Sequence, residues 1–531
     1  MSTRNSFWLV LRKPWLLAAI VYAVYCLHFL RYEWYLINTD MVSYITIAEK
    51  YARFDLVNAI NGHWSPLISW LMVPFMWMGL EAEFSFVLVL FMSGFVAFYF
   101  ADRIASKLAV PLAMRFILSF GLVMLLANGA MNTQAPDLLN ATLLLVYLDL
   151  MLGFGAMRQS SGRLLLIGCI AGVAYLAKHY TLVFFGLHFG LVALISVIKS
   201  VRSKQLRSQL ISVAMVLVGF VMVTAGWSIL LSFKYGQFTL SRAATYSQAM
   251  HHPALGAYPH LAFKLYPLPN ATAVNAWEDP SDLHNASGWN PFGSAPDFNH
   301  LLTRLGDNIV SVHRQMMNYF NLYWLPLLLL PALTYVKPLR FRWNHELIVV
   351  FVAFLVFPVG YLFLHVRERF LLFMIVLMAL LTMKLFSHFS RPDVHISARM
   401  IALMLAIAFI WQFSRHPFRE TYYSNTFETK NHYLVAKRFG TETNLKGAAI
   451  VSNADFDLTY NVSYLAGLKF YGLVDLCDTA FALEEIREFK PDYYFEWQHL
   501  KRCDASEGFV PVEGIDFYNL KVYRMANRGG V

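Results

Sequence analysis

Charged residues are scarce in this 531-residue chain, where Asp, Glu, Lys and Arg together make up 14% of the sequence. Soluble domains contain about 25% of these residues. Hydrophobic residues make up 58%, and the mean hydropathy is +0.48. This composition excludes a water-soluble globule for most of the length, and it excludes disorder, because disordered chains are poor in hydrophobic residues. We expect a chain that crosses a membrane many times.

Cysteine is also scarce, because four residues are too few for a disulfide scaffold. Cys26 and Cys169 lie in apolar runs, whereas Cys477 and Cys503 lie in the polar C-terminal part. The latter two could pair if that part faces an oxidising compartment. The sequence has no glycine-rich phosphate loop of the G-x-x-x-x-G-K-S/T or G-x-G-x-x-G kind, so we expect no soluble nucleotide site.

Eleven apolar runs are long enough, or nearly so, to span a bilayer, which takes about 20 helical residues. They are 14–36, 83–101, 109–128, 138–156, 164–178, 180–198, 209–233, 319–336, 346–364, 370–386 and 400–414. The first lacks the small-residue cleavage site of a signal peptide. The sequence therefore predicts a polytopic α-helical membrane protein with about 11 transmembrane helices.

Basic residues account for the net charge of +10, and they alternate with the runs. The basic clusters lie before the first run and after the second, fourth, sixth, eighth and tenth runs. With a cytoplasmic N-terminus, all of them fall on the cytoplasmic side, as the positive-inside rule requires. The clusters include Arg12 and Lys13, Arg103 and Lys107, Arg158 and Arg163, Lys199 to Arg207, Lys337 to Arg342, and Lys384 to Arg399. Membrane topology thus explains the excess of basic residues, and no nucleic-acid partner is expected.

Residues 66–80 are apolar but too short to span, and Pro74 interrupts them. Counting them as a span would place the basic clusters outside, so we interpret 66–80 as an interfacial helix, following a first outer loop at 37–66. Residues 41–52 also have an amphipathic helical pattern.

The pattern divides the chain into a transmembrane domain at 1–414 and a soluble domain at 415–531. A long outer loop at 234–318 shows little periodicity and is expected to be a partly ordered lid or binding loop. Strands at Ala448–Ser452, Asp492–Phe495 and Phe517–Arg524, with a helix at Ala480–Phe489, predict a small α/β fold for the C-terminal domain.

Polar residues of both signs are expected at one membrane face, namely Asp40, His63, Asp137, Lys178, His179, Arg367 and Arg369. Cations at helix ends can hold the phosphate of a lipid carrier and stabilise it as a leaving group. A carboxylate can remove the proton from an attacking hydroxyl. This combination suits the transfer of a sugar from a polyprenyl phosphate.

The first outer loop, with Asp40 to Tyr51 and then Gly62-His63-Trp64-Ser65-Pro66, resembles that of the GT-C glycosyltransferases. The similarity is greatest to the branch of the protein O-mannosyltransferases and the lipid A aminoarabinose transferase. Pro136-Asp137-Leu138-Leu139, the run from Gly172 to Lys178 and Glu368-Arg369-Phe370 resemble further family motifs, in family order over residues 40–372. Met41 stands where many relatives have a second acid, which argues against a borrowed two-carboxylate or metal scheme.

The resemblance implies a role for each candidate. Asp40 is the general base, Lys178, Arg367 and Arg369 bind the donor phosphate, and Tyr44, His63, Asp137 and His179 are further site candidates. It also implies inversion at the sugar carbon. No cofactor is required, and a divalent metal remains an open alternative.

Each assignment has a structural alternative. Asp40 and Asp137 could be helix N-caps, Lys178 could extend to the interface, His63 and His179 could be packing residues, and Arg367 and Arg369 could pair with Glu368. Glu278, Asp279 and Asp282 beside Trp277 and Trp289 could hold a sugar acceptor or form a solvated acidic loop. His251, His252 and His260 do not match the spacing of a zinc site.

The sequence thus predicts a glycosyltransferase that uses a polyprenyl-phosphate-linked sugar donor, with a glycan, glycolipid or protein as acceptor. Its expected location is the bacterial inner membrane, with the C-terminal domain in the periplasm and the bilayer as a further partner. A transporter or flippase of a lipid-linked sugar is the alternative. A non-catalytic membrane assembly protein is a third.

Overall fold

The computed structural model describes residues 13–33, 35–155, 159–249, 264–280, 290–335, 343–391, 394–423, 426–477, 479–498, 509–513 and 520–525. The histidines 251, 252 and 260, together with Asp282, Trp289 and Cys503, lie outside these ranges. The chain divides into two compact units. Unit 1 comprises Met1–Arg31, Val87–Phe238 and Pro291–Ser424, and unit 2 comprises Tyr32–Phe86, Thr239–Asn290 and Asn425–Val531.

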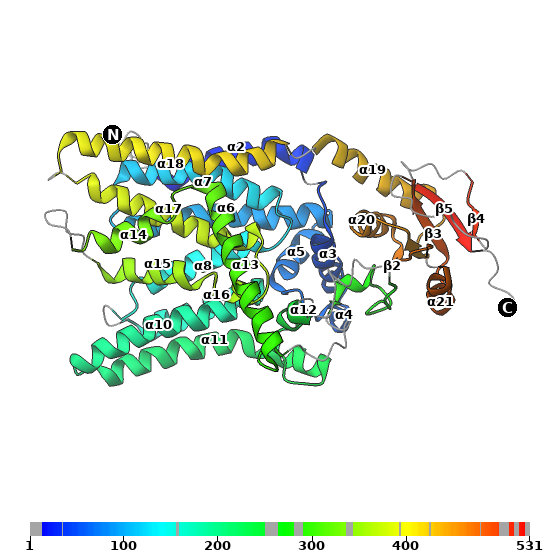
Figure 1. The fold of residues 1–531 in the computed structure, drawn as a ribbon, viewed down its shortest axis with the longest axis horizontal. Coiled ribbons are helices and arrows are strands. Elements are labelled where there is room, and N and C mark those ends of the chain that lie inside the picture. Colours follow the sequence, from blue (N-terminus) through cyan, green and yellow to red (C-terminus); the bar gives the residue numbers. More distant parts are fainter. Residues whose placement is uncertain are drawn as a thin grey trace. The chain divides into compact units, whose positions relative to one another are not determined.

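Unit 1 is built from long apolar helices that lie side by side (Figure 1). They are α2 (Pro14–Glu33), α6 (Ala82–Lys107), α7 (Leu112–Met131), α8 (Asp137–Met151), α9 (Ser161–Ala177), α10 (Thr181–Arg202), α11 (Leu206–Tyr235), α15 (His345–Val356), α17 (Leu372–Phe389) and α18 (Ile396–Tyr423). Shorter helices are α14 (Leu325–Ala332) and α16 (Val359–Leu362), and a 3-10 turn, η4 (Glu368–Leu371), precedes α17.

In the described part of the chain, seven helical stretches are long and apolar enough to cross a membrane. They match the runs expected at 83–101, 109–128, 180–198, 209–233, 346–364, 370–386 and 400–414. The polytopic helical fold is thereby confirmed, and the chain is an integral membrane protein. The apolar helical stretches in the other four expected runs are shorter, so a count of eleven spans stays a prediction. In the run 319–336, Pro326 and Pro331 accompany a helix of only eight residues.

Glycine allows close helix contact within unit 1, where α9 packs along α11. A Cβ on Gly168 would lie 1.9 Å from the carbonyl oxygen of Val216, and one on Gly219 would lie 2.2 Å from that of Leu165. Only glycine fits at such a crossing, because membrane helices pack closely where small residues let the backbones approach.

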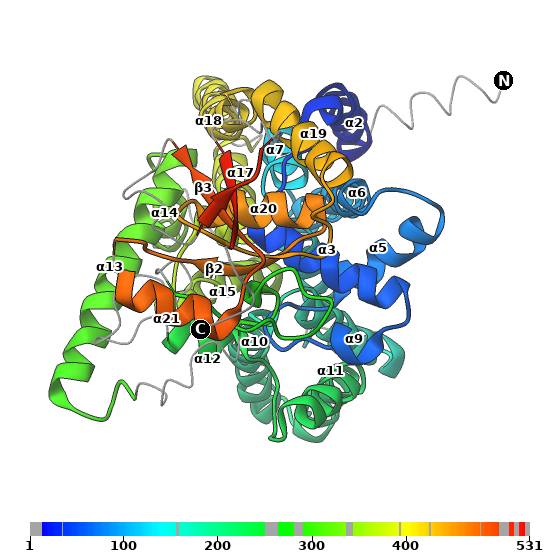
Figure 2. The ribbon, with the colours of Figure 1, turned by 90° about the vertical axis from the view of Figure 1, so that its right-hand side faces the viewer.

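Helix α13 (Ala295–Tyr319) differs from the other long helices of unit 1 because it runs across them rather than along them (Figures 1 and 2). The sequence interpretation placed a loop of little periodicity here. That interpretation is wrong for residues 295–319, which form a 25-residue helix with Ser294 as its N-cap. The side-chain oxygen of Ser294 accepts the backbone N–H of Asp297 at 3.2 Å.

Unit 2 contains the predicted first outer loop, with α3 (Thr39–Ala52), α4 (Leu56–Ala59) and α5 (Leu67–Trp77), followed by the start of α6. The middle segment adds α12 (Ala243–Ala249) and the 3-10 turn η2 (Ala276–Glu278). Helix α5 coincides with the expected interfacial helix, and its eleven residues are too few to span a bilayer.

The C-terminal part of unit 2 is an α/β fold, as the sequence predicted. Helices α19 (Thr426–Glu442), α20 (Phe456–Ala466) and α21 (Thr479–Phe489) accompany β1 (Ala449–Ser452), β2 (Lys469–Leu473), β3 (Tyr493–Trp497), β4 (Phe509–Pro511) and β5 (Leu520–Met525). The strand order is β2-β1-β3-β5-β4. Strand β1 pairs in parallel with β2 and β3, whereas β5 pairs antiparallel with β3 and β4.

Both faces of this sheet are covered. Ile450, Phe470 and Phe495 face one apolar cluster, and Val451 and Tyr494 face another. The middle segment of the chain covers the edge strand β2, because Leu265 and Asn275 form isolated bridges with Gly472 and Phe470. The backbone N–H of Phe470 donates to the carbonyl of Val274 at 2.7 Å.

The C-terminal domain contains a disulfide, which the sequence left as a possibility, because Cys477 is disulfide-bonded. Cys26 and Cys169 are not disulfide-bonded.

Candidate active site

In unit 1, Asp137 lies between two of the predicted phosphate-binding cations. Its Oδ1 accepts a hydrogen bond from Nζ of Lys178, and its Oδ2 lies 3.9 Å from Nε of Arg369. Asp137 is only 4% exposed, and both cations are largely buried. We call Asp137, Lys178 and Arg369 the Asp137 cluster. It contains two positive charges and one negative charge, so it is electropositive overall.

Helix ends position all three residues of the Asp137 cluster. Asp137 is the first residue of α8, and Pro136 before it provides no side-chain cap. Lys178 directly follows α9, where its extended backbone ends the helix. Arg369 lies in η4 at the entrance to α17. The alternative in which Asp137 only caps a helix is therefore wrong, because its carboxylate is engaged by a cation from another helix.

Aromatic rings surround Lys178. Its Nζ lies 3.9 Å from the ring centroid of Phe370 and 5.6 Å from that of Tyr361. Tyr361 in turn stacks on Tyr180 with 3.5 Å between the ring centroids. A cation over an aromatic face is attracted by the ring quadrupole, and more strongly when water is excluded. The rings therefore hold the ammonium group in a place of low dielectric, where it interacts strongly with an anion.

The link between α16 and η4 adds further positive charge. Arg367 donates from Nε to Nε2 of His365 at 3.0 Å. Burial, together with the positive charges of Arg367, Arg304 and Arg369, lowers the pKa of His365 to about 4. The imidazole is thus neutral at neutral pH and can accept the hydrogen bond from Arg367. Three arginines near one neutral histidine make this link a favourable place for an anion.

Glu368 lies between two of these arginines in sequence, but residues from other helices hold its carboxylate. Its Oε1 accepts from the hydroxyl of Tyr319 at 2.7 Å and lies 2.8 Å from Nε2 of His416. Asn318 donates to its Oε2 at 3.3 Å. Glu368 therefore anchors the start of η4 to α13 and α18.

His179 is the remaining candidate of unit 1. It is buried, and its ring lies 5.1 Å from that of Tyr175. This contact agrees with the packing role that the sequence left open.

In unit 2, Asp40 lies in the first turn of α3, but a different residue caps that helix. The side chain of Asn38 accepts the backbone N–H of Met41 at 2.8 Å. The carboxylate of Asp40 accepts the indole N–H of Trp277 at 3.4 Å. The alternative in which Asp40 is the N-cap is therefore wrong. Its place in the first turn favours a negative charge through the helix dipole.

Aromatic rings surround His63 in the same unit. Its ring lies 4.5 Å from that of Trp64, 5.1 Å from that of Tyr246 and 5.7 Å from that of Trp277. Burial lowers the pKa of His63 to about 4, although the carboxylates of Asp279 and Asp40 oppose this shift. We call Asp40, His63, Trp64, Tyr246, Trp277 and Asp279 the Asp40 cluster.

Tyr44, the last candidate of this unit, packs behind the Asp40 cluster. Its ring lies 5.1 Å from that of Trp64. The carbonyl oxygen of Tyr44 accepts a hydrogen bond from the hydroxyl of Ser69 at 2.8 Å, which fixes α3 against α5.

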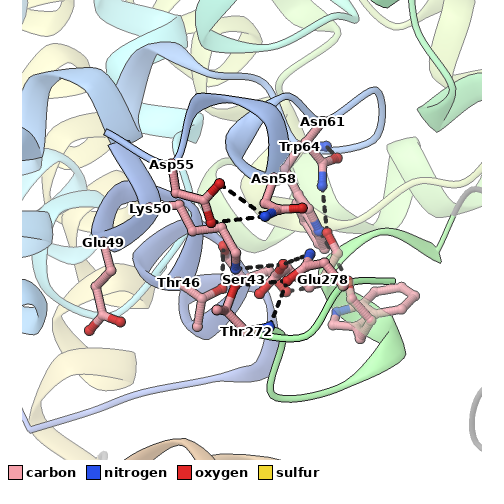
Figure 3. Close-up of polar contacts among 12 residues, drawn as sticks. Ser43, Thr46, Glu49, Lys50, Asp55, Asn58, Asn61, Trp64, Thr272 and Glu278 are labelled. Carbon is pink, nitrogen blue, oxygen red and sulfur yellow. Dashed lines mark hydrogen bonds and ion pairs between the residues drawn. The ribbon is translucent and has the colours of Figure 1, made fainter. Parts of the chain in front are cut away.

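A buried ion pair holds η2 against α3 (Figure 3). Nζ of Lys50 lies 2.7 Å from Oε1 of Glu278, and the two side chains are 5% and 1% exposed. The amide of Asn61 donates to the backbone carbonyl of Glu278 at 2.6 Å. Glu278 is therefore buried in a structural contact rather than solvated, and a role for it in acceptor binding stays a prediction. Asp279, the next residue, belongs to the Asp40 cluster.

Within the described ranges, no group of three or more His, Cys, Asp or Glu side chains could hold a metal ion. Asp40, His63 and Asp279 share a cluster, but they do not form such a group.

The structure brings the predicted residues together in two sets. Asp137, Lys178 and Arg369 meet in unit 1, with Arg367 close by, and Asp40 and His63 meet in unit 2. The sequence analysis missed Arg304, Tyr246 and the contact from Trp277 to Asp40. An aromatic residue beside acids was the only signal for Trp277.

A comparison of the sequence with protein-family models gives no match. A comparison with curated proteins gives none either. The structure, however, is similar to that of ArnT from Cupriavidus metallidurans bound to undecaprenyl phosphate. The TM-score is 0.51 at 14% identity, covering 95% of this chain and 97% of that chain. The apo state of the same protein gives the same score and identity, with 98% of that chain covered.

The structure is also similar to that of an Archaeoglobus fulgidus oligosaccharyltransferase in complex with zinc and sulfate. The TM-score is 0.50 at 10% identity, covering 87% of this chain and 64% of that chain. These likenesses show the fold. The GT-C-like fold class that the sequence indicated is confirmed: a polytopic helical membrane protein with a small C-terminal α/β domain.

Proposed function

We propose that this chain is a glycosyltransferase that moves a sugar from a polyprenyl-phosphate donor to an acceptor hydroxyl at the non-cytoplasmic membrane face. The observation that carries the proposal is the Asp137 cluster, in which a buried carboxylate holds an ammonium and a guanidinium group. Cations held in this way suit a phosphate that must be bound and then released as a leaving group. The solved structure of ArnT with undecaprenyl phosphate has the same fold and supports this substrate class.

The donor phosphate is assigned to Lys178 and Arg369, with Arg367 as a further contact. The planar guanidinium group matches two phosphate oxygens, whereas the ammonium group acts as a point charge. Asp137 orders both cations before the donor binds, so they need little reorganisation when negative charge develops on the phosphate.

Asp40 is assigned the role of general base. It accepts the proton of the acceptor hydroxyl as the hydroxyl oxygen bonds to the anomeric carbon. The bond from that carbon to the phosphate oxygen breaks, and the polyprenyl phosphate leaves with the electron pair. A single displacement of this kind inverts the anomeric centre. The indole N–H of Trp277 orients the carboxylate of Asp40 for this step.

The acceptor is assigned to unit 2, where the rings of His63, Tyr246 and Trp277 pack together beside two carboxylates. Ring faces stack on sugars, and carboxylates accept hydrogen bonds from hydroxyl groups. A glycan or glycolipid fits this surface. The proposed location is the bacterial inner membrane with the N-terminus cytoplasmic. A disulfide at Cys477 suits a C-terminal domain in the oxidising periplasm.

The test is an assay of the purified protein in nanodiscs with a polyprenyl-phosphate donor whose sugar carries a radioactive label. We expect the label to move to a glycan or glycolipid acceptor as polyprenyl phosphate is released in equal amount. A nanodisc encloses no compartment, so movement of the lipid between leaflets produces no signal. Absence of transfer for a panel of donors, together with donor movement across proteoliposomes, would instead establish a transporter.

A further inference from the structure

Helix α13 holds the link between α16 and η4, residues 363–367, which contains Arg367 and leads to Arg369. Asn308 donates to the carbonyl oxygen of Leu362 at 2.8 Å, Arg304 donates to that of Leu364, and Gln315 donates to that of Val366 at 3.3 Å. The three carbonyls belong to alternate residues. The three donors lie on the face of α13 that packs toward α16 and η4. Figure 1 shows α13 beside α16.

The link needs such support because it has little regular structure of its own. Helix α16 ends at Leu362 and η4 begins at Glu368, so the residues between them lie outside both elements. Carbonyl groups at the end of a helix lack partners within the helix. The carbonyl of Leu362 is one of these, and Asn308 satisfies it.

The same helix also fixes the far end of the link. Tyr319 and Asn318, in the last turn of α13, hold the carboxylate of Glu368. Five side chains of one helix therefore determine the path of the backbone from Leu362 to Glu368. Arg367 lies within this stretch, and Arg369 follows it directly.

We propose that Arg304, Asn308 and Gln315 of α13 are positioning residues that set the place of Arg367 and Arg369 for the donor phosphate. This inference rests on the proposed function. It assigns a role to a helix whose own side chains need not touch the donor, because they act through the backbone of the link. Arg304 also adds a third guanidinium group beside His365, so it contributes to the positive potential at the link.

The test compares binding of undecaprenyl phosphate with binding of undecaprenol, which has no phosphate, in nanodiscs. The triple variant Arg304→Met, Asn308→Ala, Gln315→Met removes all three donors. We expect its affinity for undecaprenyl phosphate to fall by about tenfold or more, since each lost hydrogen bond is worth a few-fold. Its affinity for undecaprenol should stay within about twofold, because the lipid chain is bound without the link.

Three further variants separate positioning from general damage. Arg314→Met makes the same change at an exposed arginine on the same helix and should bind like wild type. In the single variant Arg304→Lys, the positive charge and a hydrogen-bond donor remain. Its affinity for undecaprenyl phosphate should therefore stay within about threefold of wild type. Gln315→Met alone, which conserves side-chain length, should weaken phosphate binding in the same direction with an unchanged melting temperature.

The outcomes separate the two proposals. If wild type does not prefer undecaprenyl phosphate over undecaprenol, the proposed function itself is wrong. If wild type shows the preference and the triple and Gln315→Met variants keep it in full, the proposed function stands and the role of α13 is overturned. Equal loss of both lipids in every variant would also overturn the positioning role.

Discussion

Trp277 donates its indole N–H to Oδ1 of Asp40 across 3.4 Å, although 237 positions separate the two residues in the sequence. The contact joins α3 to the turn η2 within unit 2. The turn is itself held by the ion pair of Lys50 and Glu278, and by the bond from Trp64 to the carbonyl of Trp277 at 3.1 Å. The carboxylate of Asp40, which is assigned as the general base, is thus oriented by Trp277, and the contacts of Lys50 and Trp64 hold Trp277 in place.

Replacing Trp277 by phenylalanine keeps an aromatic ring and removes the N–H donor. We expect kcat to fall by about tenfold, because a hydrogen bond to a charged group is worth about 1.5–3 kcal/mol. KM for the donor should change little, since the donor phosphate is held in unit 1. Steady-state kinetics on wild type and Trp277→Phe measure both values. A raised donor KM at unchanged kcat would contradict the orienting role.

Removing the ammonium group of Lys178 should weaken the binding of polyprenyl phosphate. For Lys178→Met we expect a loss of about ten- to a hundredfold in affinity, because charge-assisted bonds to phosphate are strong. Arg369→Met should act in the same direction. Arg438→Met, at an exposed arginine paired with Glu442, is the control and should bind like wild type. Equal affinities in all three variants would exclude the Asp137 cluster as the phosphate site.

The buried pair of Lys50 and Glu278 makes a prediction about stability. Glu278→Leu leaves the ammonium of Lys50 buried without its partner, so we expect a loss of about 3–5 kcal/mol. The double variant Lys50→Met, Glu278→Leu should recover most of that loss. Glu442→Gln, at the exposed pair with Arg438, should change stability by less than about 1 kcal/mol. Thermal unfolding in detergent ranks the four proteins, and a double variant as unstable as the single one would be contrary to this account.

The lowered pKa of His63 makes a prediction about pH. Its pKa is about 4 in the folded protein, below the usual value of 6.5, because burial disfavours the charged imidazolium. Between pH 6.5 and 4 the unfolded state binds more protons at this position, so stability falls as the pH is lowered through that range. The variant His63→Gln should show a shallower fall in melting temperature over this range. A slope identical to that of wild type would show that His63 does not titrate as described.

Local sequence patterns predicted much of the fold. Apolar runs gave the seven long helices, and short apolar stretches bounded by polar residues gave β1, β3, β5 and α21. The order of polar residues at helix ends gave the members of the Asp137 cluster. These features depend on residues that are near one another in the chain, or on run lengths that match the thickness of the bilayer. Both can be recognised in a single sequence.

Contacts between distant segments were not predictable in the same way. Lys50 follows Glu49 on the polar side of an amphipathic pattern, yet it is buried because Glu278 meets it from another segment. Strand β2 was missed because Gly472 interrupts a short apolar stretch, and its edge is covered by residues from the middle of the chain. Helix α13 did leave signals in the sequence, namely the Ser294 to Asp297 capping pattern and a strongly amphipathic helical period over residues 295–319, so it could have been predicted.

The most direct measurement is the rate of sugar transfer in a single turnover, with saturating enzyme in excess over the labelled donor. Asp40→Asn is compared with Asp55→Asn, which makes the same change at a carboxylate whose partner is Asn58. We predict that Asp40→Asn transfers the sugar at least about a hundredfold more slowly than wild type, while binding undecaprenyl phosphate as well as before. Asp55→Asn should match wild type. Transfer by Asp40→Asn at the wild-type rate would contradict the assignment of Asp40 as the general base.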